Sequence, residues 1–197
     1  MTLDREGFAR PGRRALIDEL DRVDRAVFAA IAATPTPHLD AAMRRISDAA
    51  NYSKPWIGAS TIMALIGGPR GRRAAASGIV SVAVTSAIAN LISKRVLGRR
   101  PRPDREATDV PLTRHVRMPR SGSFPSGHAA SAFAFASGVA RVVPPAGLPL
   151  RALAAVVGYS RVHTGVHYPG DVVAGAVLGA SVADVTADAV TRRLSRG

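Results

Sequence analysis

Cysteine is absent from the 197 residues of the chain. This absence excludes a disulfide framework, a thiolate metal site and a thiol nucleophile. Lysine is nearly absent as well, since only two of the 27 basic residues, Lys54 and Lys94, are lysine. Strand signals are poor, because the Val and Ile residues stand among alanines and no alternating runs are bounded by turn pairs. What remains is a helical chain whose length suits one domain with a full core.

The charge balance and the hydropathy of the chain point in different directions. A formal net charge of +13 suggests a nucleic-acid-binding protein, yet 47% of the residues are hydrophobic and the mean hydropathy is +0.10. Between Arg73 and Lys94, twenty consecutive residues carry no formal charge. A helix needs about twenty residues to cross the hydrocarbon layer of a bilayer. Residues 74–93 therefore predict a membrane helix, and we expect the membrane bilayer as a partner and no nucleic acid.

Four further apolar segments are shorter, less apolar or interrupted by charge: 55–69, 121–140, 147–160 and 171–190. All of them are rich in Ala, Gly and Ser, which lets helices approach one another closely inside a bilayer. The same composition also suits the core of a soluble helical bundle. We predict an all-α fold, a polytopic transmembrane helix bundle of five or six membrane helices with an amphipathic N-terminal helix.

The N-terminal fifty residues have a different pattern. In residues 16–33 apolar side chains recur at helical spacing with charged side chains opposite, which predicts an amphipathic helix, and a shorter amphipathic stretch follows at 39–50. We expect an amphipathic helical segment at 1–50 and a membrane domain at 51–197. The first helix either lies flat, which leaves five crossings, or inserts as a sixth. No cleavable signal peptide is expected, because acidic residues interrupt every candidate apolar stretch.

A basic segment occupies residues 94–125, where nine Lys and Arg residues accompany three acidic ones. One explanation is the excess of basic residues that flanks membrane helices or attracts anionic headgroups. The other is a phosphate pocket, because arginine forks match phosphate oxygens in pairs. The position of the segment alone does not decide between them.

The residues directly after the basic segment favour the phosphate pocket. Pro125 precedes Ser126, a good helix N-cap, and Gly127 and His128 then open an apolar helix. Free backbone N–H groups and the positive end of the dipole at such a helix start favour an anion. Gly127 lets the anion approach the backbone, and His128 can give or take a proton near neutral pH.

A second helix start repeats this construction. Pro169 suits the first turn of a helix, so Asp171 falls within that turn and His167 lies just outside it. A carboxylate bonded to one imidazole nitrogen leaves the other nitrogen as a nucleophile or base. Arg161, at the end of the preceding apolar segment, is expected to add a cation to the same pocket.

These residues make the chain similar to the type 2 phosphatidic acid phosphatase family, membrane enzymes related in their active sites to bacterial nonspecific acid phosphatases, glucose-6-phosphatase and vanadium haloperoxidases. The second motif of that family, Pro-Ser-Gly-His, is matched by residues 125–128. The third motif is Ser-Arg, five residues, His, three residues and Asp, and it is matched at Ser160, Arg161, His167 and Asp171. Both matches are complete in residues and spacing, and the resemblance spans about residues 54–190.

The first motif of the family, Lys, six residues and Arg-Pro, is matched less cleanly. Five residues separate Lys94 from Arg100 and seven separate it from Arg102, whereas exactly six separate Arg95 from Arg102. We favour Arg102 as the family arginine. Either Lys94 or Arg95 then serves as the cation at the start of the motif.

The resemblance implies a metal-independent lipid phosphatase that forms a phosphohistidine and needs no cofactor. His167 would attack phosphorus while Asp171 supports its ring, and His128 would protonate the leaving oxygen and then activate water. The phosphate oxygens would be held by Lys94 or Arg95, Arg102, Ser126, the backbone at Gly127, and Arg161. The sequence contains no acidic cluster of the kind that holds Mg²⁺ or paired metals.

The resemblance defines the substrate only as a class, a lipid phosphate that enters sideways from the bilayer. A polyprenyl diphosphate or a decaprenyl-phosphoryl pentose phosphate is expected first, and phosphatidate or phosphatidylglycerol phosphate second. A basic membrane protein that binds anionic lipid without chemistry is the remaining alternative, but it leaves the spacing of His128, His167 and Asp171 unexplained.

Three further features bear on the site. His163 lies one helical turn before His167, but the matched motif does not use it, and Asn51 begins a weak glycosylation triplet. The helix order places residues 94–125 and 163–170 on one face of the membrane. On the other face it places six arginines: Arg70, Arg72, Arg73, Arg192, Arg193 and Arg196. Because that second face carries a basic tail and a short loop, we expect it to be cytoplasmic and the active site to be extracytoplasmic. The oligomeric state is not predicted.

Overall fold

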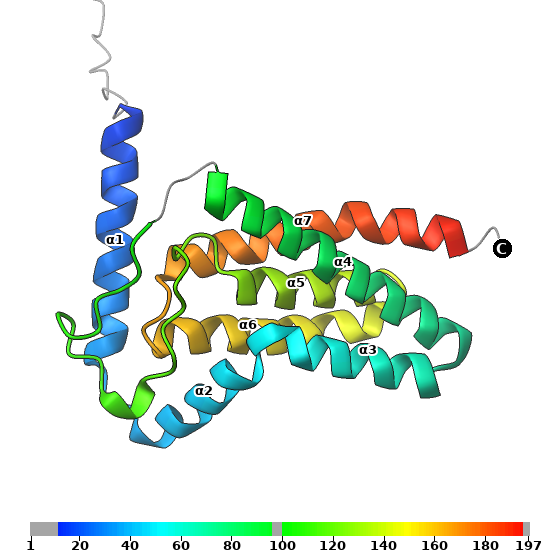
Figure 1. The fold of residues 1–197 in the computed structure, drawn as a ribbon, viewed down its shortest axis with the longest axis horizontal. Helices are drawn as coiled ribbons and strands as arrows, with labels where there is room; N and C mark the ends of the chain where they lie inside the picture. Colours follow the sequence, from blue (N-terminus) through cyan, green and yellow to red (C-terminus); the bar gives the residue numbers. More distant parts are fainter. Residues whose placement is uncertain (1–11, 96–99, 195–197) are drawn as a thin grey trace, which may run out of the picture.

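The computed structural model describes residues 12–95 and 100–194, and all regular structure in these two ranges is helical. In these ranges seven α-helices are joined by short turns, two of which contain a 3₁₀ turn, and by one long loop between α4 and α5 that contains a third (Figure 1). The helices are α1 (Arg13–Ala33), α2 (Pro37–Ala49), α3 (Lys54–Ile66), α4 (Gly68–Arg95), α5 (Gly127–Ala140), α6 (Gly147–His163) and α7 (Pro169–Leu194).

Helix α5 is the centre of the bundle. Ten of its 14 residues are buried, and it packs against α4, α6 and α7. Most of the buried residues are Ala, Gly or Ser, so its neighbours come close to its backbone. Phe135 is the largest buried side chain of α5 and packs on Trp56 from α3, with ring centroids 5.2 Å apart.

The contact between α5 and α7 depends on two glycines of α7. A Cβ atom at Gly175 would lie 2.4 Å from the carbonyl oxygen of Ser126, and one at Gly179 would lie 2.1 Å from that of Ala130. Such distances are far below contact distance, so only glycine allows the two backbones to approach this closely. Small residues that bring helices together are typical of membrane helix interfaces. The same contact joins the N-terminal ends of the two helices that carry the histidine motifs.

Two helices are long and apolar enough to cross a membrane among the described residues, through Gly68–Leu91 in α4 and Pro169–Val190 in α7. The first contains most of the predicted segment 74–93. The second corresponds to 171–190, which Asp184 and Asp188 interrupt in the sequence. Helix α5 has 14 residues and a length of about 21 Å, less than the roughly 30 Å of a hydrocarbon core. The expectation of five or six crossings is therefore not confirmed.

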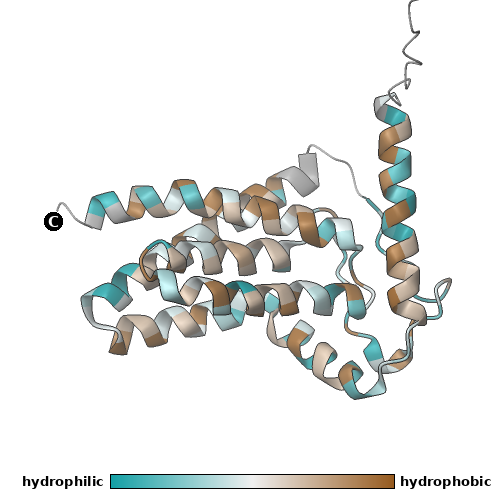
Figure 2. Ribbon diagram, turned by 180° about the vertical axis from the view of Figure 1, so that it is seen from behind, coloured by the Kyte–Doolittle hydropathy of each residue, from teal (hydrophilic) through white to brown (hydrophobic). Residues whose placement is uncertain are grey.

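Helix α1 runs across the direction of the bundle helices, with its C-terminal part against one end of the bundle and its N-terminal part projecting beyond it (Figure 1). It contacts α6 and α7, and Phe28 packs edge-on against Tyr168 with ring centroids 5.5 Å apart. Apolar and hydrophilic residues alternate along the helix (Figure 2), and Leu16, Leu20 and Val23 are exposed. The predicted amphipathic helix is thus present and packs on the bundle, while its contact with a membrane interface stays a prediction.

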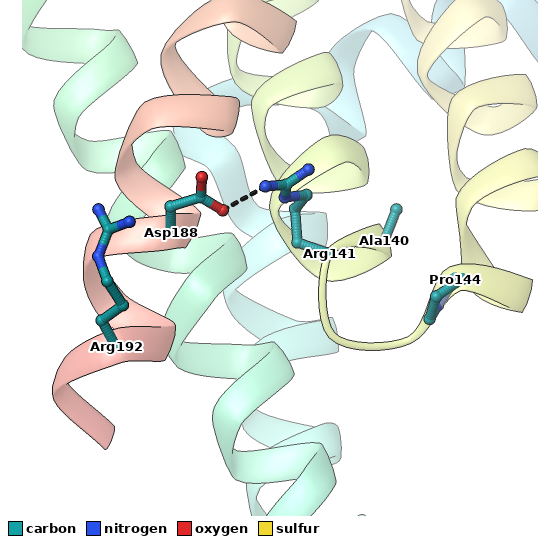
Figure 3. A pocket seen from close by; sticks show the side chains of 5 residues that line it. All are labelled: Ala140, Arg141, Pro144, Asp188 and Arg192. Carbon is teal, nitrogen blue, oxygen red and sulfur yellow. Dashed lines mark hydrogen bonds and ion pairs between the residues drawn. The ribbon is translucent and has the colours of Figure 1, made fainter. Parts of the chain in front are cut away.

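The two ends of the bundle differ in what they carry. One end holds the loop between α4 and α5, the end of α6 and the start of α7, as expected. The other holds Arg70, Arg72 and Arg73 at the start of α4 and Arg192 and Arg193 at the end of α7, whereas residues 195–197 lie outside the described ranges. Figure 3 shows a pocket of about 460 Å³ at this second end, where Arg141 forms an ion pair with Asp188. None of its five lining residues belongs to the three sequence motifs.

Candidate active site

The structure joins the two histidine motifs through their backbones. The N–H of Ser126 donates to the carbonyl oxygen of Asp171 at 2.9 Å. The Ser126 hydroxyl accepts from the N–H of Ala129 at 3.4 Å, so this serine is the N-cap of α5 that the sequence predicts. The starts of α5 and α7 are therefore held side by side.

Asp171 lies behind His167, fully buried in the first turn of α7. One of its carboxylate oxygens, Oδ2, accepts from the N–H of Tyr168 at 2.9 Å and lies 3.5 Å from Nδ1 of His167. His167 itself is 2% exposed. A carboxylate at this place can stabilise a positive charge on the imidazole and limit rotation of its ring.

Arg102 lies on the other side of His167. Its Nη1 is 3.3 Å from Nε2 of His167 and donates to the carbonyl oxygen of Val166 at 2.6 Å, while Nη2 donates to the carbonyl oxygen of Gly122 at 3.0 Å. Because a guanidinium can only donate, Nε2 accepts and the proton of a neutral His167 is on Nδ1, toward Asp171. The lone pair of a neutral His167 is then on Nε2, on the side of Arg102.

The surroundings of His167 keep it neutral. Burial lowers its pKa to about 4, and the nearby charge of Arg102 acts in the same direction, whereas Asp171 opposes the shift. Burial also lowers the pKa of Arg102 from its ordinary value. At neutral pH the site therefore holds an uncharged imidazole beside a guanidinium.

His128 and His167 line one cavity of about 610 Å³, a size common for small-molecule sites. Its walls come from the turn after α2, the end of α4, the long loop and the start of α5. Arg102 lines it, and so do Arg117 and Arg120, which the sequence placed only within a generally basic segment. Gly127 lines it with open space where a Cβ would be, and its role in the approach of an anion stays a prediction.

Asn51 is a cavity residue that the sequence did not identify. Its side-chain oxygen lies 3.0 Å from Nε2 of His128, and both residues line the cavity. The 77 residues that separate them along the chain exclude any local signal for this contact. The triplet that begins at Asn51 had suggested only glycosylation.

Arg161 is buried beneath the site, 1% exposed, and is not among the residues that line the cavity. Its Nη1 donates to the carbonyl oxygen of Ser47 at 3.0 Å and to the hydroxyl of Ser47 at 2.5 Å. Its Nε is buried and has no hydrogen-bond partner. Arg161 of α6 is thus bonded to Ser47 of α2 and keeps a buried Nε without a partner, and its predicted contact with phosphate stays a prediction.

The first motif is only partly described. The side chains of Lys94 and Arg95, the last two residues of α4, lie outside the described part of the structure, so neither can be chosen as the phosphate cation. The two candidate arginines make different contacts. Arg102 contacts His167, whereas Arg100 donates to Asp171 Oδ1 at 2.7 Å.

His163 lies in a buried ion-pair cluster outside the cavity. Its Nε2 lies 3.0 Å from Asp40 Oδ1, and the same oxygen accepts from Nε of Arg114 at 2.8 Å. His163 and Arg114 are both buried, and neither lines the cavity. This ion-pair cluster joins α2, the long loop and α6. Within residues 12–95 and 100–194, no group of three or more His, Asp or Glu side chains is arranged to hold a metal ion.

Comparison with known proteins agrees with the motifs. A model of the PAP2 superfamily matches residues 74–194. A decaprenylphosphoryl-5-phosphoribose phosphatase of Mycobacterium tuberculosis is 39% identical over 150 residues, which cover 74% of this chain and 77% of that protein. A lipid A 1-phosphatase of Rhizobium johnstonii is 36% identical over 112 residues, 54% of this chain and 44% of that protein.

Solved structures share the fold at lower identity. A transmembrane PAP2-type phosphatidylglycerolphosphate phosphatase from Bacillus subtilis superposes with a TM-score of 0.65 at 23% identity, over 86% of this chain and 85% of that one. LpxE of Aquifex aeolicus gives a TM-score of 0.61 at 21% identity, over 83% of this chain and 94% of that one. With the family match over residues 74–194, the histidine motifs and the shared cavity, the chain belongs to the PAP2 superfamily and is a phosphatase.

Proposed function

We propose that the chain is an integral-membrane, metal-independent lipid phosphatase that removes a phosphoryl group from a polyprenyl-linked substrate through a phosphohistidine on His167. The observation that carries this proposal is the cavity into which both motif histidines open, with Arg102 on one side of His167 and Asp171 behind it. Neither nonspecific lipid binding nor a structural role calls for this arrangement.

In the first step, Nε2 of His167 attacks phosphorus and the bond from phosphorus to the leaving oxygen breaks. The imidazole becomes positively charged, and Asp171 at Nδ1 stabilises that charge. Burial and the nearby cations lower the pKa of His128 to about 3, so the substrate phosphate enters with the proton that His128 passes to the leaving oxygen. The lipid product then departs as an alcohol or a lower phosphate. Arg102 and the backbone at Gly127 stabilise the negative charge on the equatorial oxygens.

In the second step, water attacks the phosphohistidine. His128 now takes a proton from that water, the N–P bond breaks, and inorganic phosphate leaves while His167 returns to its neutral form. Arg161 supports the proposal as a second cation, because its buried Nε has no hydrogen-bond partner. Lys94 or Arg95 would complete the set of phosphate ligands.

The substrate proposal follows the relatives and the composition of the cavity. The 39% identical relative is named for a decaprenyl-linked sugar phosphate, and the 36% identical relative for the lipid A 1-phosphate. Both names describe a phosphate on a lipid-linked polar group. The cavity offers arginines beside Asn51, Asn90 and Ser131, which suits a phosphate with a polar neighbour.

The location proposal is a multi-pass protein of the cell membrane with an extracytoplasmic cavity. The two apolar helices α4 and α7 support the membrane location. The arginines at the end of the bundle opposite the cavity support the orientation, because cytoplasmic ends of membrane helices are enriched in arginine.

The test is phosphate release by purified protein in detergent with a metal chelator present. A panel of polyprenyl diphosphate, a polyprenyl-phosphoryl sugar phosphate, phosphatidate and phosphatidylglycerol phosphate compares the substrate classes. We expect turnover with at least one polyprenyl substrate and its loss in His167→Ala. Substrate labelled with ³²P should leave an acid-labile phosphoryl group on wild type and none on His167→Ala.

The matched control is His38→Ala, since His38 is an exposed histidine of α2 outside the cavity lining. It should keep wild-type turnover. Equal turnover in wild type and His167→Ala, or no turnover with any lipid phosphate, would remove the basis for this mechanism. A preference for phosphatidate or phosphatidylglycerol phosphate would replace the polyprenyl assignment.

A further inference from the structure

Helix α1 reaches the catalytic motif through one arginine, Arg100. Its Nη2 donates at 2.8 Å both to Asp21 and to Asp24 of α1, and its Nη1 donates at 2.7 Å to Asp171 Oδ1. The guanidinium also lies over the ring of Tyr168, 4.4 Å from its centroid. One side chain thus links the first helix to the residue that lies behind His167.

A second contact joins the same elements without Arg100. Asp24 Oδ1 accepts from the N–H of Gly170 at 2.7 Å, in the first turn of α7. Arg25 donates to the hydroxyl of Tyr168 at 3.3 Å and forms an ion pair with Asp21 at 2.6 Å. Helix α1 therefore contacts residues 168 and 170 directly by side-chain polar groups, in addition to the packing of Phe28.

The charge of Asp171 explains why this link matters for chemistry. Asp171 is fully buried, and its neighbour His167 is neutral at rest. A buried carboxylate without a cation tends to take up a proton. Arg100 directly contacts Asp171 through an ion pair at Oδ1. The other carboxylate oxygen, Oδ2, accepts from the N–H of Tyr168 and lies near Nδ1 of His167.

Arg100 in turn depends on α1. Burial disfavours its charge, but the carboxylates of Asp24, Asp171 and Asp21 outweigh that effect and raise the pKa of Arg100. The side chain of Asp24 is 11% exposed, so this pair is shielded from solvent more than an ordinary surface ion pair. The family model begins at residue 74, so α1 lies outside the part of the chain that defines the family.

We propose that Arg100, held by Asp21 and Asp24 of α1, is a positioning residue that keeps Asp171 ionised and oriented toward Nδ1 of His167. This inference rests on the proposed role of His167 as the nucleophile. The arginine does not touch substrate: it acts through Asp171, and α1 acts through the arginine.

The test compares Arg100→Gln, Arg100→Lys and the double variant Asp21→Asn with Asp24→Asn. Loss of such an outer hydrogen-bonding partner typically lowers activity by about 10- to 100-fold. We expect Arg100→Gln to lower kcat within that range with little change in KM, and to move the acid limb of the pH–kcat profile to higher pH, because Asp171 then protonates more easily. Arg100→Lys should recover part of kcat. The double variant should change kcat and the acid limb in the same direction, by less.

Glu19→Gln is the matched control, because Glu19 lies on α1, pairs with Arg22 and is more than half exposed. It removes one negative charge from the same helix and should leave kcat and the pH profile unchanged. The thermal midpoint of each variant in detergent is measured alongside.

Two results would overturn the inference. One is that Arg100→Gln keeps the wild-type kcat and the wild-type acid limb. If Arg100→Gln does not fold, the same result in the double variant of Asp21 and Asp24 overturns the inference instead. The other is a fall in activity that follows the thermal midpoint with no movement of the acid limb, which is the behaviour of a purely structural contact. Failure of the proposed function is recognised separately, by turnover that persists in His167→Ala.

Discussion

At the scale of single residues, the neutral state of His167 has a consequence for stability. Burial lowers the pKa of its imidazole to about 4, below the usual value near 6.5. Between these pH values the unfolded chain binds a proton at this position and the folded chain does not. The contribution of His167 to the free energy of unfolding is therefore complete above pH 6.5 and falls as the pH drops toward 4. We expect the thermal midpoint of wild type in detergent to fall between pH 7 and pH 5.

The variant His167→Asn separates this contribution from those of the carboxylates and of His128 and His163, whose pKa values burial also lowers. Its thermal midpoint should change less between pH 7 and pH 5 than that of wild type. His38→Ala, at an exposed histidine, should keep the wild-type difference. An equal pH dependence in wild type and His167→Asn would show that His167 is not held neutral.

The contact between Asn51 and His128 predicts a selective loss of acid catalysis. Removal of the amide in Asn51→Ala frees the imidazole of His128 to rotate, since its Nε2 loses a partner at 3.0 Å. General acid assistance contributes roughly 10²- to 10⁴-fold, so partial misplacement should lower kcat about tenfold for a lipid substrate with a poor leaving group. Turnover of p-nitrophenyl phosphate, whose leaving group needs little protonation, should fall much less.

Tyr52→Phe supplies the control for Asn51→Ala, because Tyr52 is the next residue, lines the same cavity and is 82% exposed. It should leave the ratio of the two activities unchanged. Equal losses on both substrates in Asn51→Ala would mean that Asn51 supports the cavity as a whole rather than the orientation of His128.

Local residue patterns identified the histidines and Asp171, but not the partners that come from distant parts of the chain. Ser126, His128, His167 and Asp171 stand in short motifs, so their proximity to a helix start follows from neighbouring residues. Asn51, which meets His128, and Arg100, which meets Asp21, Asp24 and Asp171, are separated from their partners by 71 to 79 residues. Those pairings depend on how the helices pack, and no periodicity or spacing encodes them. Both Arg100 and Arg102 precede a proline, and the motif spacing favoured Arg102 as the family arginine but gave Arg100 no role.

At the scale of helices, the approach of α7 to α5 sets the distance between the two histidine motifs. Gly179→Ala would place a methyl group 2.1 Å from the carbonyl oxygen of Ala130, so the helices must separate. Overpacking of this kind costs about 1–3 kcal/mol. We expect a lower thermal midpoint and a lower kcat, because the starts of α5 and α7 shift with the helices.

Gly58→Ala is a matched substitution in α3, where a Cβ atom meets nothing within 4 Å. Alanine favours a helix over glycine by about 1 kcal/mol, so this variant should be as stable as wild type or more stable, with unchanged kcat. A Gly179→Ala variant that behaved like Gly58→Ala would contradict the tight contact between α5 and α7.

The sequence predicted the helices well and their ends less well. The amphipathic stretches at 16–33 and 39–50 became α1 and α2, and the proline and serine signals placed the starts of α5 and α7 correctly. The start of α4 was missed, since this helix begins at Gly68 and includes Arg70, Arg72 and Arg73. Charged residues were treated as boundaries, but at the exposed end of a long helix they do not interrupt it.

At the scale of the whole molecule, the bundle has one end with the cavity and another with arginines at the start of α4 and the end of α7. One portion of the basic residues therefore lies at the proposed phosphate site and another at the proposed cytoplasmic end. Only the second portion indicates how the protein is oriented in the membrane. Arginines that bind substrate are needed at the active site, whichever side of the membrane it faces. The charge count must be replaced by a direct measurement of which end is outside.

The lack of cysteine allows that measurement, since one introduced thiol is the only one in the chain. Leu112→Cys marks an 81% exposed residue in the loop at the cavity end, and Pro145→Cys marks an exposed turn at the opposite end. In intact spheroplasts of an expressing bacterium, a membrane-impermeant maleimide should label Leu112→Cys, and should label Pro145→Cys only after permeabilisation. The reverse pattern would put the cavity in the cytoplasm, and labelling of both in intact cells would show that the two ends are not separated by a membrane.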